Sequence, residues 1–320
     1  MLVINALQSV LSIMIMVSIG YLLSKKKWLD KKTSNLFSKL IVNISLPSVM
    51  IYNLMTSFNK VELLDTLGGI IVPFLGILIT YIISIPLAKL LKIREDRRGM
   101  FSALFAFANT IFIGLPVNVA LFGEASIPYV ILYYIANTTI FWTIGIYGIK
   151  KDGEFGKDIK SDNKLISFST AKRIFSPILA SYVLSIILIL LEINLPKFIL
   201  DTCRYLGNLT TPLSMLIIGT IIYSINLKEL KFDKDMLAIT LGRFIITPLF
   251  VFVMLRFFPV AKLLMGKVFI LEAAMPAMTT IAIVGQAYDA DNEYATVKIT
   301  MTILISLFVI PIYMYLISFM

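Results

Sequence analysis

The residues best suited to chemistry in this sequence lie in the apolar stretch FANTIFIGLPVNVALFGEA, residues 107–125. Amide, hydroxyl and backbone groups cluster there around a Gly-x-Pro, and the candidate ligand-binding residues are Asn109, Thr110, Gly114, Pro116 and Asn118. These side chains offer hydrogen bonds but carry no formal charge. The pattern therefore predicts recognition of a polar ligand and not covalent catalysis.

A second stretch, AAMPAMTTIAIVGQAY at 273–288, has the same character. Pro276 lies near its start, and Thr279 and Thr280 follow within about one turn. Further candidates are Asn137 and Thr138 in YYIANTTIFW, because an amide or hydroxyl inside an apolar helix either binds a ligand or joins neighbouring helices by hydrogen bonds. Both interpretations of these two residues stay open.

Enzymatic chemistry has few residues to use here. Cys203 is the single cysteine and the sequence contains no histidine, which excludes a Cys/His zinc site, a Ser-His-Asp triad and an intrachain disulfide. Carboxylates are scarce inside the apolar runs, where Glu272 is the main candidate. We therefore expect a protein that is not an enzyme and that needs no metal or cofactor.

Composition places these stretches in a membrane. Hydrophobic residues make up 58% of the 320 residues and charged residues 15%, against about 45–50% and 25% in soluble domains. Apolar runs of roughly 20 residues, long enough to cross about 30 Å of hydrocarbon, recur along the chain. We expect ten transmembrane helices, at 3–24, 34–57, 66–91, 98–122, 126–149, 173–193, 203–225, 236–258, 264–288 and 294–318.

The basic residues predict the orientation of these helices. Loops that follow odd-numbered helices carry 20 of the 29 Lys and Arg residues, so we expect these loops in the cytoplasm and both termini outside it. The longest of them, 150–172, is polar and is expected to be a cytoplasmic linker. Anchoring to anionic lipid of the plasma (cytoplasmic) membrane explains the net charge of +10, and no nucleic-acid partner is needed.

Landmarks recur in the two halves of the chain. Pro116 and Pro276 are 160 residues apart, and an N-x-x-x-P spacing repeats at an offset of 165, formed by Asn43, Pro47, Asn208 and Pro212. Five helices in each half would make the second copy enter the membrane from the opposite side. We therefore predict inverted repeats at 1–149 and 173–320, with the four N-x-x-x-P residues lining the site from the scaffold side.

Matched prolines in inverted repeats suggest how the site is built. A proline at mid-membrane removes a backbone donor and frees carbonyl groups that lipid cannot satisfy, although a single proline is more often a packing kink. Two discontinuous helices that cross can direct the partial positive charges of their N-termini at one anion. We expect helices 4 and 9 to be interrupted at Pro116 and Pro276 and to bind substrate where they cross.

Charged residues inside the runs are functional candidates because burying them is costly. Lys298 is either a counter-charge for an anionic substrate or a lysine that extends to the inner surface. Arg243 lies deeper in its helix, at about residue seven. Glu272 either binds a proton or sodium, pairs with a cation or anchors its helix end; with Gln286 and Arg243 it forms the candidate set for ion coupling.

These motifs resemble those of the auxin efflux carrier family. The N-T-x-x-x-G-x-P pattern that begins at Asn109 is similar to the family's fourth helix, the A-A-x-P start at 273–276 to its ninth, and NISLPSVM to its N-x-x-L-P segment. The short central linker is similar to that of the prokaryotic branch with its malate-type permeases. Ala277 stands where the plant carriers have glutamine, so the plant substrate is not implied.

The resemblance implies the fold of bile-acid symporters and sodium/proton antiporters. Helices 1, 2, 6 and 7 would form a scaffold domain, through which related folds often dimerise, and helices 3–5 and 8–10 an elevator-type transport domain. It also implies organic anions such as malate or malonate as substrates. We predict a secondary transporter of small carboxylates that works by alternating access; the alternatives are a sodium-coupled symporter of bile-acid type and a receptor that binds at the same site without transport.

Overall fold

The computed structural model describes residues 2–156, 177–224, 232–258 and 262–318, and these residues are almost entirely helical. Six of their helices are long and apolar enough to cross a membrane. The paired extended backbone in this part of the chain is one antiparallel bridge, between Ala108 and Ala277. Most of the expected central linker, 157–172, lies outside the described residues; its first residues continue a helix that ends at Glu154.

The described residues up to 156 contain nine α-helices. They are α1 (Leu2–Lys25), α2 (Lys31–Leu40), α3 (Leu46–Ser57), α4 (Lys60–Leu67), α5 (Ile71–Leu90), α6 (Arg98–Ala106), α7 (Leu115–Phe122), α8 (Ile127–Ile140) and α9 (Ile146–Glu154). Several are joined end to end by shorter helical turns, so that α8 and α9 form one span with the turns η5 (Glu124–Ser126) and η6 (Phe141–Gly145).

The second half is built in the same way within its described residues. Its helices are α11 (Pro177–Leu190), α12 (Lys197–Gly207), α13 (Thr210–Tyr223), α14 (Lys234–Leu241), α15 (Thr247–Phe257), α16 (Leu263–Ala273), α17 (Thr280–Ala287) and α18 (Asn292–Ser318). Helices α14 and α15 are joined into one span, whereas α16 and α17 are separated by a non-helical segment.

Prolines inside the joined helices are accommodated by π-helical turns. In each, the first residue after the turn donates its N–H to the carbonyl five residues earlier, which widens the helix just before the proline ring. The wider turn relieves the clash that a proline creates in a regular α-helix. The pairs are η1 (Ile41–Ser45) before Pro47, η4 (Thr110–Gly114) before Pro116 and η8 (Gly242–Ile246) before Pro248.

The first interrupted helix breaks earlier than the sequence suggested. Helix α6 ends at Ala106 and the chain is helical again from Thr110, so the non-helical residues are 107–109. Pro116 lies inside the continuous helix formed by η4 and α7, and the expected break at Pro116 was wrong because the π-turn absorbs the proline. The second interruption, between α16 and α17, does contain the predicted Pro276.

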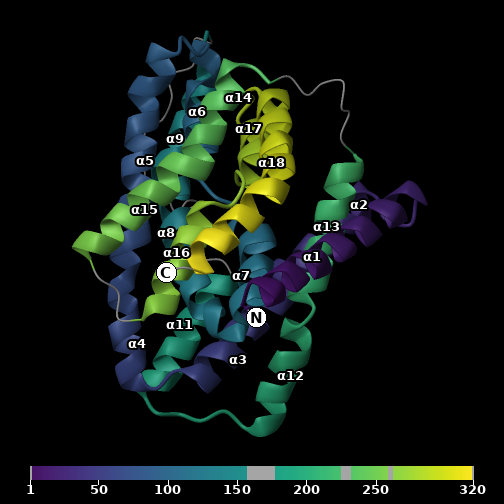
Figure 1. The fold of residues 1–320 in the computed structure, drawn as a ribbon, viewed down its shortest axis with the longest axis vertical. Coiled ribbons are helices and arrows are strands. Elements are labelled where there is room, and N and C mark those ends of the chain that lie inside the picture. Colours follow the sequence, from purple (N-terminus) through teal and green to yellow (C-terminus); the bar gives the residue numbers. More distant parts are fainter. Residues whose placement is uncertain (1, 157–176, 225–231, 259–261, 319–320) are drawn as a thin grey trace.

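The helices pack in two sets (Figure 1). Helix α1 packs along α13, and α3 packs against α11 and α12. Helix α5 packs against α6, α8 and α15, and α6 also packs against α9. The non-helical segments before η4 and α17 lie within the second set, among buried residues.

Close packing in the second set depends on small residues and on one buried carboxylate. A Cβ on Gly99 of α6 would collide with the backbone of Gly148 in α9, so these helices touch through glycines. Asp152, also on α9, accepts hydrogen bonds from the N–H groups of Gly99 at 2.9 Å and Met100 at 2.7 Å. The carboxylate thereby satisfies free amides at the N-terminus of α6, where negative charge is favourable.

Candidate functional site

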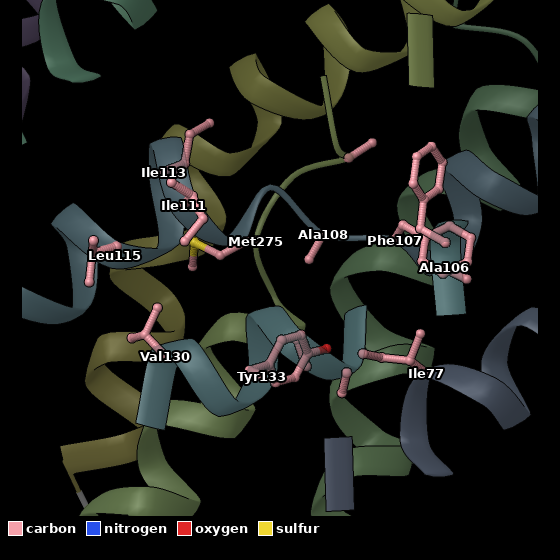
Figure 2. Packing of buried hydrophobic residues seen from close by; sticks show 14 of the residues in the cluster. Ile77, Ala106, Phe107, Ala108, Ile111, Ile113, Leu115, Val130, Tyr133 and Met275 are labelled. Atoms are coloured by element: carbon pink, nitrogen blue, oxygen red, sulfur yellow. The ribbon is translucent and has the colours of Figure 1, made fainter. Parts of the chain in front are cut away.

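The two interrupted helices cross through their non-helical segments. The Asn109 N–H donates to the Pro276 carbonyl at 2.8 Å, and the Met278 N–H donates to the Phe107 carbonyl at 3.1 Å. Figure 2 shows Phe107 and Ala108 on one segment where it passes the chain that carries Met275. Two peptide segments that lipid could not solvate thus satisfy part of each other's backbone.

The outer edges of this crossing are covered by side chains. Asn137 of α8 accepts a hydrogen bond from the Ala108 N–H and donates to the Ala108 carbonyl, both at 3.1 Å. Thr302 of α18 accepts from the Ala277 N–H at 3.1 Å. The Asn137 amide therefore pairs with the backbone of Ala108 as a neighbouring strand would. Of the two interpretations of Asn137, this contact matches the structural one.

Arg243 holds the C-terminal ends of both half-helices. Its guanidinium, fully buried, donates to the Ala106 carbonyl at 2.6 Å, to the Ala273 carbonyl at 2.7 Å and twice to the Met275 carbonyl, at 3.0 and 3.2 Å. Each helix C-terminus carries roughly half a negative charge. Two such ends balance one guanidinium, which explains how a cation is accommodated in an apolar interior.

The N-terminal ends of the other two half-helices meet at a cavity. The first ladder bond of the η4–α7 helix runs from the Gly114 N–H to the Asn109 carbonyl, so the amides before it have no partner in the helix. The cavity has a volume of about 200 Å³. The residues of the two crossing stretches that line the cavity are Ala108, Asn109, Thr110, Ile111, Phe112, Met278, Thr279 and Thr280. The other lining residues are Val42, Tyr134, Thr138, Trp142 and Ile178.

No charged residue lines this cavity among the described residues, yet it is rich in polar groups without partners. The Asn109 amide and the hydroxyls of Thr279 and Thr280 form no hydrogen bond within the described part of the chain. The Thr138 hydroxyl is buried and likewise unpaired. A ligand here would meet free donors, two positive helix ends and aromatic walls from Tyr134 and Trp142.

A second polar cluster lies beside the crossing. Glu272, in the last turn of α16, is fully buried and accepts a hydrogen bond from the Asn118 amide at 2.7 Å. The same amide nitrogen donates to the Gly114 carbonyl at 2.9 Å. A Cβ on Gly114 would collide with the Glu272 carboxyl group, so Glu272 packs directly on the η4–α7 helix. Gly114 and Asn118, both predicted to bind substrate, belong to this cluster.

Lys298 lies away from both clusters. Its ammonium forms an ion pair with Asp233 at 2.6 Å and lies 5.5 Å from the centre of the Tyr294 ring. Asp233 caps the N-terminus of α14 by accepting from the Met236 N–H. Lys298 is 3% exposed, and this pairing joins α18 to the start of α14.

The remaining predicted residues are spread over other surfaces. Gln286 is exposed in the last turn of α17, whereas Glu272 is buried. Asn43 is exposed and donates to the Lys39 carbonyl, and the neighbouring Val42 lines the crossover cavity instead, together with Ile178 of α11. Pro47 and Pro212 do not line it either, and Asn208 lines a separate cavity of about 120 Å³.

The sequence alone did not single out Trp142 or Thr302, whereas Thr138, which lines the cavity, was a candidate together with Asn137. Thr302 has no local signal, because a threonine in an apolar helix usually bonds its own backbone. The described residues contain no group of three or more His, Cys, Asp or Glu side chains that could hold a metal ion.

Comparison with known proteins agrees with this architecture. Residues 5–314 match the model of a family described as "Membrane transport protein". An "Uncharacterized transporter MJ1031" of Methanocaldococcus jannaschii is 28% identical over 310 residues, which cover 95% of this chain and 96% of that protein. An "Uncharacterized transporter" of Methanothermobacter thermautotrophicus is 24% identical over 322 residues, covering 98% and 99%. The chain belongs to the membrane transport protein family, the auxin efflux carrier family that its motifs resemble.

Proposed function

We propose that this protein is a secondary transporter of small organic anions, with carboxylates as the substrate class and the binding site at the crossing of the two interrupted helices. One observation carries the proposal: two half-helix N-termini converge on a cavity that no charged side chain lines among the described residues. Helix N-termini attract anions through free amides and a partial positive charge. Two of them favour an anion without an arginine or lysine in the site.

The size and lining of the cavity support a small substrate with an apolar part. Its volume of about 200 Å³ is below the roughly 300–1,000 Å³ of pockets for drug-sized ligands. Free hydroxyl and amide donors lie along the crossing segments, while Trp142 and Tyr134 supply apolar walls. A short mono- or dicarboxylate matches this combination better than a bulky amphipathic anion does.

Alternating access would follow from motion between the two helix sets. Val42 and Ile178 line the cavity from the set that contains α3 and α11, and the crossing segments line it from the other. We propose that the first set is the scaffold and the second an elevator-type transport domain, and that each contains helices from both inverted five-helix repeats, 1–149 and 173–320. The plasma membrane location, the extracytoplasmic termini and a homodimer formed through the scaffold are part of the same proposal.

Substrate identity can be screened with the protein's own cysteine. Cys203 is buried, so a dye that becomes fluorescent on reaction with a thiol reports unfolding of the detergent-purified protein. A ligand at a hundred times its dissociation constant adds about 2.7 kcal/mol to stability and is visible as a raised melting temperature. The screen should contain mono- and dicarboxylates, with amines of matched size as controls.

Counterflow in proteoliposomes then tests transport. Vesicles loaded with the best unlabelled carboxylate should accumulate the labelled one, and Asn109→Ala should weaken its binding by roughly 1.5–3 kcal/mol, because a donor to a charged group is lost. Lys298→Ala should bind normally, since Lys298 is paired with Asp233. Binding without counterflow would indicate a receptor, uptake that needs sodium would indicate the symporter of bile-acid type, and preference for the amines would contradict the proposal.

A further inference from the structure

Glu272 and Asn118 leave unpaired acceptors in the interior of the protein. Glu272 Oε1 accepts from Asn118 Nδ2, but Glu272 Oε2 has no hydrogen-bond partner and neither has Asn118 Oδ1. Both residues are fully buried. The hydroxyl of Tyr133, on α8, is also buried without a partner. Unpaired buried acceptors cost about 1–3 kcal/mol each, and an ionised carboxylate costs more.

A single proton would lower this cost. On Glu272 Oε2 it makes the carboxyl group neutral and turns an unpaired acceptor into a donor, and the other unpaired buried oxygens of this cluster, Asn118 Oδ1 and the Tyr133 hydroxyl, are candidate acceptors. We propose that Glu272, held by Asn118 against Gly114, is a proton-binding site that is occupied in this conformation, and that its proton is the ion coupled to transport. The coupling half of this proposal rests on the function proposed above; the proton-binding half does not.

A bare cation fits the same place poorly. A cation stripped of water needs a shell of oxygens, as in channels that use carbonyl groups for this purpose. The carbonyls that end α6 and α16, of Ala106, Ala273 and Met275, already accept from Arg243. The carboxyl group also lies against Gly114, where even a methyl group would collide with it. A proton needs neither space nor further ligands.

Few charged side chains surround Glu272 on the described elements that pack against α16. Two titratable side chains interact with it electrostatically, Arg243 of η8 and Tyr133 of α8. Helix α7 and η4 contribute no titratable group. The other charged residues of the elements packed on α16, and of α16 itself, are Glu124 of η5, Arg256 of α15, Lys267 of α16, and Glu293 and Lys298 of α18.

Proximity to the cavity links the proton to the substrate. Gly114, which Glu272 contacts, lies about one helical turn beyond Thr110, which lines the cavity. An ionised Glu272 would repel an anion there, and at an effective dielectric constant of about 20 this repulsion weakens anion binding by on the order of tenfold. This coupling is reciprocal, so a bound anion also strengthens proton binding at Glu272. The anion and the proton should therefore be transported together in the same direction.

Infrared spectroscopy tests the proton site without any substrate. In lipid at neutral pH, the wild-type protein should show the carbonyl stretch of a neutral carboxylic acid, and Glu272→Gln should lack it. Glu293→Gln, which changes an exposed carboxylate, should keep the band. Asn118→Ala should shift its frequency, because a hydrogen bond to the group is lost; this variant serves if Glu272→Gln does not fold. Absence of the band from the wild-type spectrum overturns the proposal.

Proteoliposomes test the coupling. The probes are radiolabelled malonate and malate, and a gradient of about one pH unit, acidic outside, should raise the accumulation of a transported anion by about tenfold per coupled proton. Glu272→Gln should retain exchange but lose the effect of the gradient. Wild-type uptake that ignores the gradient overturns the coupling. No uptake of any probe overturns transport of these carboxylates and the coupling with it, while the infrared result still decides the proton site.

Discussion

Replacing Arg243 should destabilise the crossing of the interrupted helices. Arg243→Met preserves an apolar stem of similar length but removes every donor to the carbonyls of Ala106, Ala273 and Met275. Each buried carbonyl left unpaired costs about 1–3 kcal/mol, so the three together cost roughly 3–9 kcal/mol. The variant also no longer buries a guanidinium, which returns several kcal/mol. We expect a net loss of about 3 kcal/mol.

The loss should be visible as a lower melting temperature. Taking about 2–4 °C per kcal/mol for a chain of this size, Arg243→Met should melt on the order of 10 °C below the wild type. Reaction of the buried Cys203 with a thiol-reactive dye during heating measures this in detergent. Arg243→Lys should lie between the two, because one ammonium cannot reach both helix ends as the planar guanidinium does.

Arg256→Met provides the matched control. Arg256 is exposed in the last turn of α15, where its guanidinium lies 5.4 Å from the centre of the Phe252 ring. Loss of such an exposed contact costs about 0.5–1 kcal/mol. If Arg243→Met melted within the range of Arg256→Met and transported normally, the two helix C-termini would not need their shared cation, and our explanation of the buried charge would be refuted.

Three further outcomes follow from the geometry. Asn137→Leu should lower the melting temperature by the equivalent of about 2–4 kcal/mol, because both backbone groups of Ala108 lose their partner; a melting temperature equal to that of the wild type would contradict the strand-like role. Gly99→Ala should sharply reduce folded yield and Gly68→Ala should not, since a Cβ on Gly68 meets nothing within 4 Å; fluorescence-detected size exclusion compares them. Burial raises the pKa of Asp233, but the Lys298 ammonium and the Met236 N–H lower it further, so that the net pKa is below 3.8. The stabilisation is therefore present above about pH 4 and lost as the pH falls through the lowered pKa; with the Asp233 side chain 47% exposed it is at most about 1 kcal/mol. Lys298→Met should reduce this acid sensitivity of the melting temperature, leaving the part that the Met236 N–H contributes.

Hydropathy and polar clustering predicted much of this architecture. Runs of apolar residues identified a membrane protein, and the pairing of Asn109 and Thr110 with Thr279 and Thr280 at one cavity is what crossing half-helices require. The apolar runs could be predicted because each depends on residues adjacent in sequence. The meeting of the two polar stretches could be predicted because similar landmarks recur in the two halves of the chain.

The position of the first break could not be predicted in this way. Pro116 removes a donor, but a π-turn accommodates it, and the helix instead ends at Ala106, where distant side chains replace the helical hydrogen bonds. Asn137 and Arg243 come from other helices, so no local pattern reports their contacts. The ion pair of Lys298 could not be predicted for the same reason, because its partner, Asp233, is 65 residues away along the chain.

Two helix N-termini, without a charged side chain among the described lining, should make the crossover cavity favourable for anions. This preference can be measured from the rates at which thiosulfonate reagents of matched size and opposite charge modify Thr280→Cys in a Cys203→Ser background. Thr202→Cys, at an exposed position of α12, is the reference. We predict that the ratio of anionic to cationic modification rates is roughly tenfold higher at position 280 than at the reference, equivalent to about 1.4 kcal/mol. A ratio equal to that of the reference, or in favour of the cationic reagent, would show that the helix N-termini do not favour anions in this cavity.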